Sequence, residues 1–129
     1  MPVDSLDNAI LAAKHGADRL EVCSDLASEG WTPDPAMLAE IVKRTPPQIE
    51  SVSLIRPRCA KDRRKGGRGS SLQAKDFVLS EGDLATSLAS VVDAARAGAA
   101  GIAIGPLNAN GTVDTKSLKE LVQAANHHG

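Results

Sequence analysis

The chain has 129 residues, a length that allows one domain. Hydrophobic residues make up 42% and charged residues 24%, which is typical of a folded globular protein and excludes a disordered or collagen-like chain. Aromatic residues are only 2%, so Ala, Leu, Ile and Val must form the core, and a nucleic-acid surface built on base stacking is excluded.

Charge and cysteine content restrict the partners and the compartment. The formal net charge of -1 gives no overall field that would attract nucleic acid or an anionic membrane. Two cysteines are too few for a disulfide framework, no signal peptide precedes the first helical pattern, and no apolar run is long enough to span a membrane. We therefore expect a cytoplasmic or nuclear protein with no membrane or nucleic-acid partner.

The first half of the chain alternates helical and strand patterns. A Ser N-cap and a Gly stop predict a helix over residues 5–16, and alternating polarity predicts a strand over 19–23. The Thr-Pro pair at 32–33 predicts the start of a second helix at residue 32. The Pro-Pro pair at 46–47 predicts the end of this helix. Residues 51–56 predict the next strand.

The second half begins with an unusual segment. Residues 59–75 contain glycines, lack an apolar period and hold six basic residues against one acidic residue, so we expect a basic, flexible loop inserted into the domain. A long apolar stripe predicts a helix over 81–97, residues 100–105 predict a strand, and Asp114 is the expected N-cap of a last helix.

This alternation predicts a parallel sheet with helical crossovers, and an internal repeat specifies which kind. Residues 12–22 resemble residues 94–104 at a constant offset of 82. If two strand–helix units and an insertion of about 15 residues fill that offset, each unit averages roughly 33 residues, close to the ~31 of an eight-fold barrel. We predict an α/β fold, a partial (βα)8 TIM-type barrel of about three and a half units with parallel strands.

The same offset assigns the two faces of the strands. Leu20 and Val22 align with apolar residues of the later strand and should face the helices, which leaves Glu21 and Cys23 facing the barrel interior. Both lie near the carboxyl end of their strand, where barrel proteins keep their functional sites.

Several segments together resemble the CutC copper homeostasis family. The resemblance implies a single-domain eight-fold barrel and a role in cytosolic copper homeostasis through copper binding. It rests on GADRLEVC at 16–23, EGWTP at 29–33, IRPR at 55–58, Asp76 and Phe77 with Ser80, and the stretch 105–114.

The chain also departs from the family pattern. The family's first strand and its cysteine are expected to be missing, residues 59–75 intervene after IRPR, and Leu79 stands where the family has Tyr. The sequence stops before the family's fifth strand, so we expect about half a barrel. Four parallel strands would leave two open edges, and we expect the chain to form a homo-oligomer that covers them.

Cys23 is the candidate metal ligand. By position it matches the family's copper-linked cysteine, and a thiolate is a suitable soft ligand for Cu(I). The alternative is a small buried hydrophobic residue at a strand end. Cys59, inside the basic segment, has no family counterpart.

Glu21, Arg56 and Arg58 are the candidate ligand-binding residues. Two guanidinium groups at the end of a strand can hold a carboxylate or phosphate bidentately, which favours a small anionic or metal-bound ligand. The alternative is a structural ion pair with Glu21 or with acids at helix ends.

Three functions are therefore open. The first is copper homeostasis through Cu(I) binding. The second is a barrel enzyme that uses Glu21 as acid or base on a small anionic substrate. The third is a truncated half-barrel that has lost the family activity.

Overall fold

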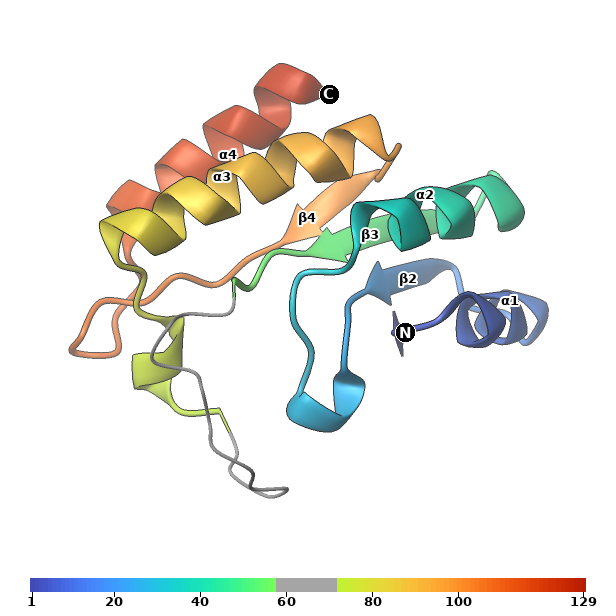
Figure 1. Cartoon of the computed structure of the whole chain (residues 1–129), viewed down its shortest axis with the longest axis horizontal. Coiled ribbons are helices and arrows are strands. Elements are labelled where there is room, and N and C mark those ends of the chain that lie inside the picture. Colours follow the sequence, from blue (N-terminus) through green and yellow to red (C-terminus); the bar gives the residue numbers. More distant parts are fainter. Residues whose placement is uncertain (58–71) are drawn as a thin grey trace.

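The computed structural model describes residues 1–57 and 72–129. Within these residues, four parallel strands form one sheet in the order β1-β2-β3-β4, and each strand leads into a helix (Figure 1), as predicted for a partial barrel. The elements are β1 (Pro2–Val3), α1 (Leu6–Lys14), β2 (Arg19–Val22), the 3-10 turn η1 (Leu26–Ser28), α2 (Pro35–Arg44), β3 (Glu50–Leu54), the 3-10 turn η3 (Ala74–Phe77), α3 (Glu81–Arg96), β4 (Gly101–Ala103) and α4 (Thr115–His128).

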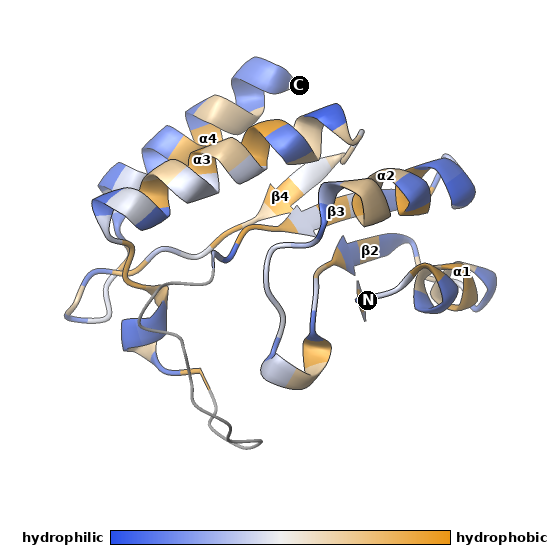
Figure 2. Ribbon diagram, viewed as in Figure 1, coloured by the Kyte–Doolittle hydropathy of each residue, from blue (hydrophilic) through white to orange (hydrophobic). Residues whose placement is uncertain are grey.

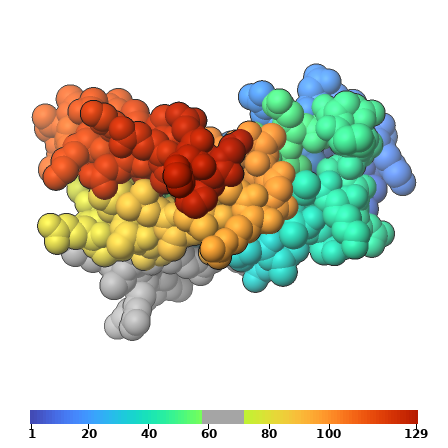
Figure 3. Space-filling model, turned by 90° about the horizontal axis from the view of Figure 1, so that it is seen from above, coloured from blue at the N-terminus to red at the C-terminus, as the bar shows by residue number. Residues whose placement is uncertain are grey.

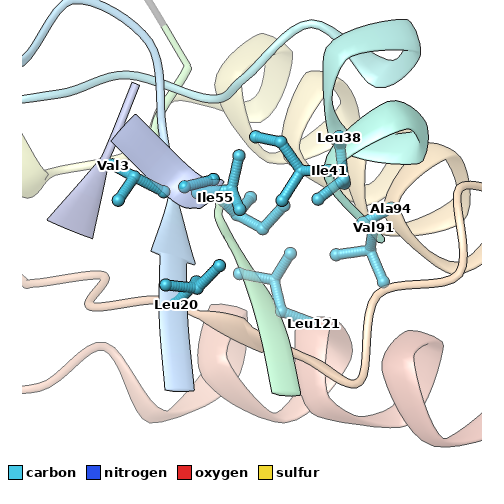
Figure 4. Packing of buried hydrophobic residues seen from close by; sticks show 10 residues of the cluster. Val3, Leu20, Leu38, Ile41, Ile55, Val91, Ala94 and Leu121 are labelled. Atoms are coloured by element: carbon cyan, nitrogen blue, oxygen red, sulfur yellow. The ribbon is translucent and has the colours of Figure 1, made fainter. Parts of the chain in front are cut away.

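The hydrophobic core lies between the sheet and the helices. Figure 4 shows the side chains of Val3 and Leu20 in the sheet, and of Ile55 directly after β3, pointing towards side chains of α2, α3 and α4. Figure 2 shows hydrophobic and hydrophilic residues alternating along the helices, as expected when one side of each helix packs on a sheet. The buried cluster consists of Val3, Ala9, Leu20, Val22, Leu38, Ile41, Ile55, Val91, Ala94 and Leu121.

Side-chain caps explain where the helices begin. Ser5 Oγ accepts a hydrogen bond from Asn8 N at 3.1 Å at the start of α1, and Asp114 Oδ1 accepts one from Ser117 N at 3.1 Å at the start of α4. Both caps are as predicted. Ser80 and Asp83 form a reciprocal capping box at the start of α3. No helix in the described part of the chain is both long and apolar enough to cross a membrane.

The predicted start of the second helix is wrong by three residues. Asp34, not the Thr32-Pro33 pair, caps α2, because its Oδ1 accepts a hydrogen bond from Ala36 N at 2.7 Å and Pro35 occupies the first helical position. Thr32 makes a tertiary contact instead, since its Oγ1 accepts a hydrogen bond from Arg56 N at 2.8 Å.

The first strand is present as two residues, which corrects the expectation that it is missing. Pro2 and Val3 pair with Glu21 and Val22 of β2. Met1 O accepts a hydrogen bond from Glu21 N at 2.9 Å, so a strand this short still forms because pairing needs only backbone groups. Val3 is 2% exposed and adds its side chain to the core.

Smaller differences concern strand ends and the basic segment. The strand predicted at 51–56 is β3 at 50–54, and the strand predicted at 100–105 is β4 at 101–103. Both end early because the chain leaves the sheet there for the loops at its carboxyl end. Most of the predicted loop at 59–75 lies outside the described residues. Its last two residues, Ala74 and Lys75, begin η3 rather than a loop, because Asp76 Oδ2 accepts a hydrogen bond from Gln73 N at 2.8 Å.

Within residues 1–57 and 72–129 the sheet is open, with β1 and β4 at opposite ends of the strand order. Figure 3 shows the first unit, in blue, and α4, in red, on opposite sides of the molecule. In the part of the chain that the structure describes, β1 and β4 are therefore the edge strands.

Candidate functional site

The loops that follow the strands gather at the carboxyl end of the sheet (Figure 1). A cavity of about 300 Å³ opens there, at the ends of β3 and β4. It is lined by Glu21, Leu54, Ile55, Arg56, Pro57, Asp76, Phe77, Leu79, Ser87, Ala103, Ile104, Gly105, Pro106 and Leu121. Arg56 and two carboxylates thus share one cavity with mainly apolar walls, a composition typical of small-ligand sites.

Cys23 lies directly after β2 and is covered by the turn that follows. The residue is 1% exposed, and its Sγ donates a hydrogen bond to Val3 O at 3.5 Å. Ser24 and Trp31 exchange backbone hydrogen bonds of 2.9 and 2.8 Å, which folds the turn back on itself. Gly30 packs against the thiol, since a Cβ at this glycine would lie 3.4 Å from Cys23 Sγ.

This environment keeps the thiol protonated. Burial raises the pKa of Cys23 from 9.0 to about 11, and the negative charges of Asp4 and Glu21 add to the increase while Arg56 opposes it. A metal ion at this sulfur would have to displace the proton and reach past the turn.

The described residues do not form a closed metal centre. No group of three or more His, Cys, Asp or Glu side chains is placed to hold a metal ion in residues 1–57 and 72–129. Cys59 lies outside these residues. The fit to copper therefore rests on one soft ligand, Cys23.

Arg56 ties the turn after β2 to the end of β3. Its backbone N donates to Thr32 Oγ1 at 2.8 Å, and its O accepts from Thr32 N at 3.1 Å. Its Nη1 donates to Glu29 O at 2.8 Å and to Gly30 O at 2.9 Å. The guanidinium carbon lies 5.1 Å from the centroid of the Phe77 ring, within the range of a cation–π contact.

The predicted trio is only partly brought together. Glu21 and Arg56 line the same cavity, but within the described residues they form no ion pair, because Arg56 bonds to backbone carbonyls. Arg58 lies outside the described residues.

Sequence reasoning did not assign site roles to Asp76, Phe77 and Asp4. The first two line the cavity, and their presence in the family-like motif was the available signal. Asp4 Oδ2 accepts a hydrogen bond from Leu26 N at 3.1 Å and so holds the start of the turn that covers Cys23. Nothing in the spacing of Asp4 indicates this contact, which depends on tertiary structure.

Parallel strands with crossover helices, and a pocket at the carboxyl ends of the strands, define an α/β protein of the (βα)8 barrel class. The model of the CutC family matches residues 1–129, and the chain belongs to the CutC family.

Individual relatives agree with this assignment. The chain is 32% identical over 126 residues to the copper homeostasis protein cutC homolog of Caenorhabditis elegans, covering 98% of this chain and 44% of that protein. It is 33% identical over 119 residues to a CutC family protein of Rhizobium meliloti (strain 1021), covering 92% of this chain and 41% of that protein. The chain thus spans less than half the length of these relatives.

The fold has a close counterpart among solved structures. The crystal structure of a CutC protein from Streptococcus agalactiae superposes with a TM-score of 0.77 at 22% identity, over 98% of this chain and 53% of the other. The match supports the partial barrel fold.

Proposed function

We propose that this chain acts in copper homeostasis and that Cys23 is the residue that binds Cu(I). The relative from Caenorhabditis elegans is named a copper homeostasis protein, and thiolate sulfur suits Cu(I). The position of Cys23 supports this proposal, because the residue directly follows the carboxyl end of β2 and its sulfur lies beneath Gly30 of the turn 24–31. The proposal places the chain in the reducing cytoplasm, where thiols remain free.

The raised pKa determines how strongly copper can bind. With a pKa of about 11, the thiolate fraction of Cys23 at pH 7 is roughly 1 in 10,000, and copper must compete with the proton. Apparent affinity for Cu(I) should therefore rise about tenfold per pH unit up to the pKa.

The test is an anaerobic Cu(I) titration against a competing chelator. Cys59→Ser is the parent variant, so that Cys23 is the only thiol. We expect one Cu(I) per chain in the parent and none after the further change Cys23→Ser, with the circular dichroism spectrum unchanged. Equal copper uptake by both folded variants would rule out Cys23 as the ligand.

A second candidate function is the binding or conversion of a small oxyanion in the cavity. Arg56 favours it, because within the described residues Nε and Nη2 donate no hydrogen bond to protein while Nη1 donates two. Glu21 in the same cavity would be the acid or base of an enzymatic step. We expect phosphate to perturb the NMR signals of residues around Arg56 in the parent, and not in Arg56→Ala. Identical perturbations in both would exclude this site.

A further inference from the structure

We propose that Arg56 is a positioning residue with two roles. One edge of its guanidinium closes the turn 24–31 over Cys23, and the other edge takes a small oxyanion from the cavity. An oxyanion bound at Arg56 would then protect the thiol. This inference rests on the oxyanion site of the second candidate function and does not require copper.

The closing contact is direct. Nη1 carries two hydrogens, and the two carbonyls that accept from it belong to Glu29 and Gly30, at 2.8 and 2.9 Å. Gly30 is the residue that packs on Cys23 Sγ. Arg56 therefore holds the part of the turn that separates the sulfur from the surface.

The turn needs such ties because its backbone is strained. Asp25 and Glu29 have φ of 51° and 67°, in the left-handed region that side chains other than glycine rarely adopt. At its start the turn is held by the hydrogen bond from Leu26 N to Asp4 Oδ2, and at its end by Arg56. Loss of Arg56 should free the end that covers Cys23.

The second edge of the guanidinium is suited to an oxyanion. Nε and Nη2 form a planar fork that matches two oxygens of a carboxylate or phosphate. Arg56 lines the cavity, and the Phe77 ring 5.1 Å from its guanidinium carbon restricts its movement. An oxyanion on this fork would fix the guanidinium in place, and Nη1 would stay on the two carbonyls.

The experiment measures how fast Cys23 reacts with the uncharged reagent 4,4'-dithiodipyridine. The parent is again Cys59→Ser, and Arg56→Ala and Arg56→Lys are made in it. The matched control is Arg19→Ala, which removes an exposed arginine paired with Glu50 at the other end of the strand. Rates are compared in phosphate, in acetate and in chloride of equal ionic strength.

We expect Arg56→Ala to react about tenfold faster than the parent, the factor that corresponds to 1.4 kcal/mol of lost hydrogen bonding. Arg56→Lys should lie between them, because an ammonium cannot hold both carbonyls in the same geometry. The control should react at the parent rate. Phosphate or acetate should slow the parent severalfold with saturation and leave Arg56→Ala unchanged, and the more effective anion indicates whether the site prefers phosphate or carboxylate.

Two results would overturn the inference. A parent-like rate in Arg56→Ala would show that Arg56 does not close the turn. An equal effect of both anions on parent and Arg56→Ala, or no effect on the parent, would show that no oxyanion acts through Arg56. If urea titrations show that Arg56→Ala is unfolded, the inference is judged on two other results. These are the reaction rate of Arg56→Lys and the effect of the anions on the parent, and a parent-like rate or no anion effect would overturn it. Failure of copper binding would leave all these rates unchanged, so the two proposals are tested separately.

Discussion

The two faces of the four-stranded sheet differ in what covers them. On the outer face Leu20 and Val22 are 0% exposed beneath the helices. On the inner face Glu21, Val52 and Ala103 are only half-buried. The helix that follows each strand is thus sufficient to bury one face, whereas the other face requires chain from elsewhere, as the opposite strands provide in a closed barrel.

Leu54 and Cys23 are exceptions on the inner face, at 7% and 1% exposed, because Gly30 of the turn 24–31 lies against both side chains. Of these two residues, Cys23 is the one with a proposed function. It lies on the inner face, yet it is as buried as the outer-face core because the turn 24–31 covers it. Burial by a short turn differs from burial by helices, since a turn can open without unfolding of the sheet.

The largest expected difference between the faces is in stability. Ile41→Ala removes a side chain that is 0% exposed in the outer-face core, and it should lower the free energy of unfolding by about 2–5 kcal/mol. Val52→Ala, on the half-buried inner face, should cost less than about 1 kcal/mol. Urea unfolding of both variants measures the difference. Equal losses would contradict the assignment of the two faces.

The next effect is the titration of Cys23. In the Cys59→Ser variant, thiolate absorbance at 240 nm should rise with a midpoint near pH 11, because burial raises the pKa from 9.0 to about 11. Since the folded state holds this proton more tightly, the resulting stability is complete below pH 9 and is lost as the pH rises towards 11. Cys23→Ala should lack this loss. A midpoint near 9 in the folded protein would mean that the turn leaves the thiol accessible to water.

A smaller effect is expected at the start of α3, in the outer layer. Ser80→Ala removes the cap whose Oγ accepts from Asp83 N at 3.1 Å, and it should cost about 1 kcal/mol. The reaction rate of Cys23 with thiol reagents should not change, because this cap lies in the helical layer. A faster reaction would show that the outer layer also controls the turn.

Local features made much of the fold predictable. Ser5 and Asp114 were recognised as caps because a helix start depends on a few neighbouring residues. Leu20 and Val22 were assigned to the helix-covered face because strand alternation and the internal repeat fix which side they occupy. The same reasoning placed Cys23 at the carboxyl end of a strand.

Features that depend on distant contacts were not predictable. Two residues, Pro2 and Val3, form a strand only because β2 offers its edge. Arg56 was expected to bind an anion or pair with Glu21, but the carbonyls of Glu29 and Gly30 reach one side of it through a turn with left-handed backbone. No pattern in the sequence indicates that approach.

This chain folds as a half-barrel whose sheet is covered by helices on its outer face and is largely uncovered on its inner face. We propose that a second copy of the chain covers the open face and edges, because unpaired parallel strands expose backbone donors, acceptors and apolar surface. Light scattering on the 129-residue chain across a concentration series, with calorimetry on the same samples, measures this association. We expect concentration-dependent association to a dimer or larger species. A monodisperse monomer that unfolds cooperatively at every concentration would contradict it.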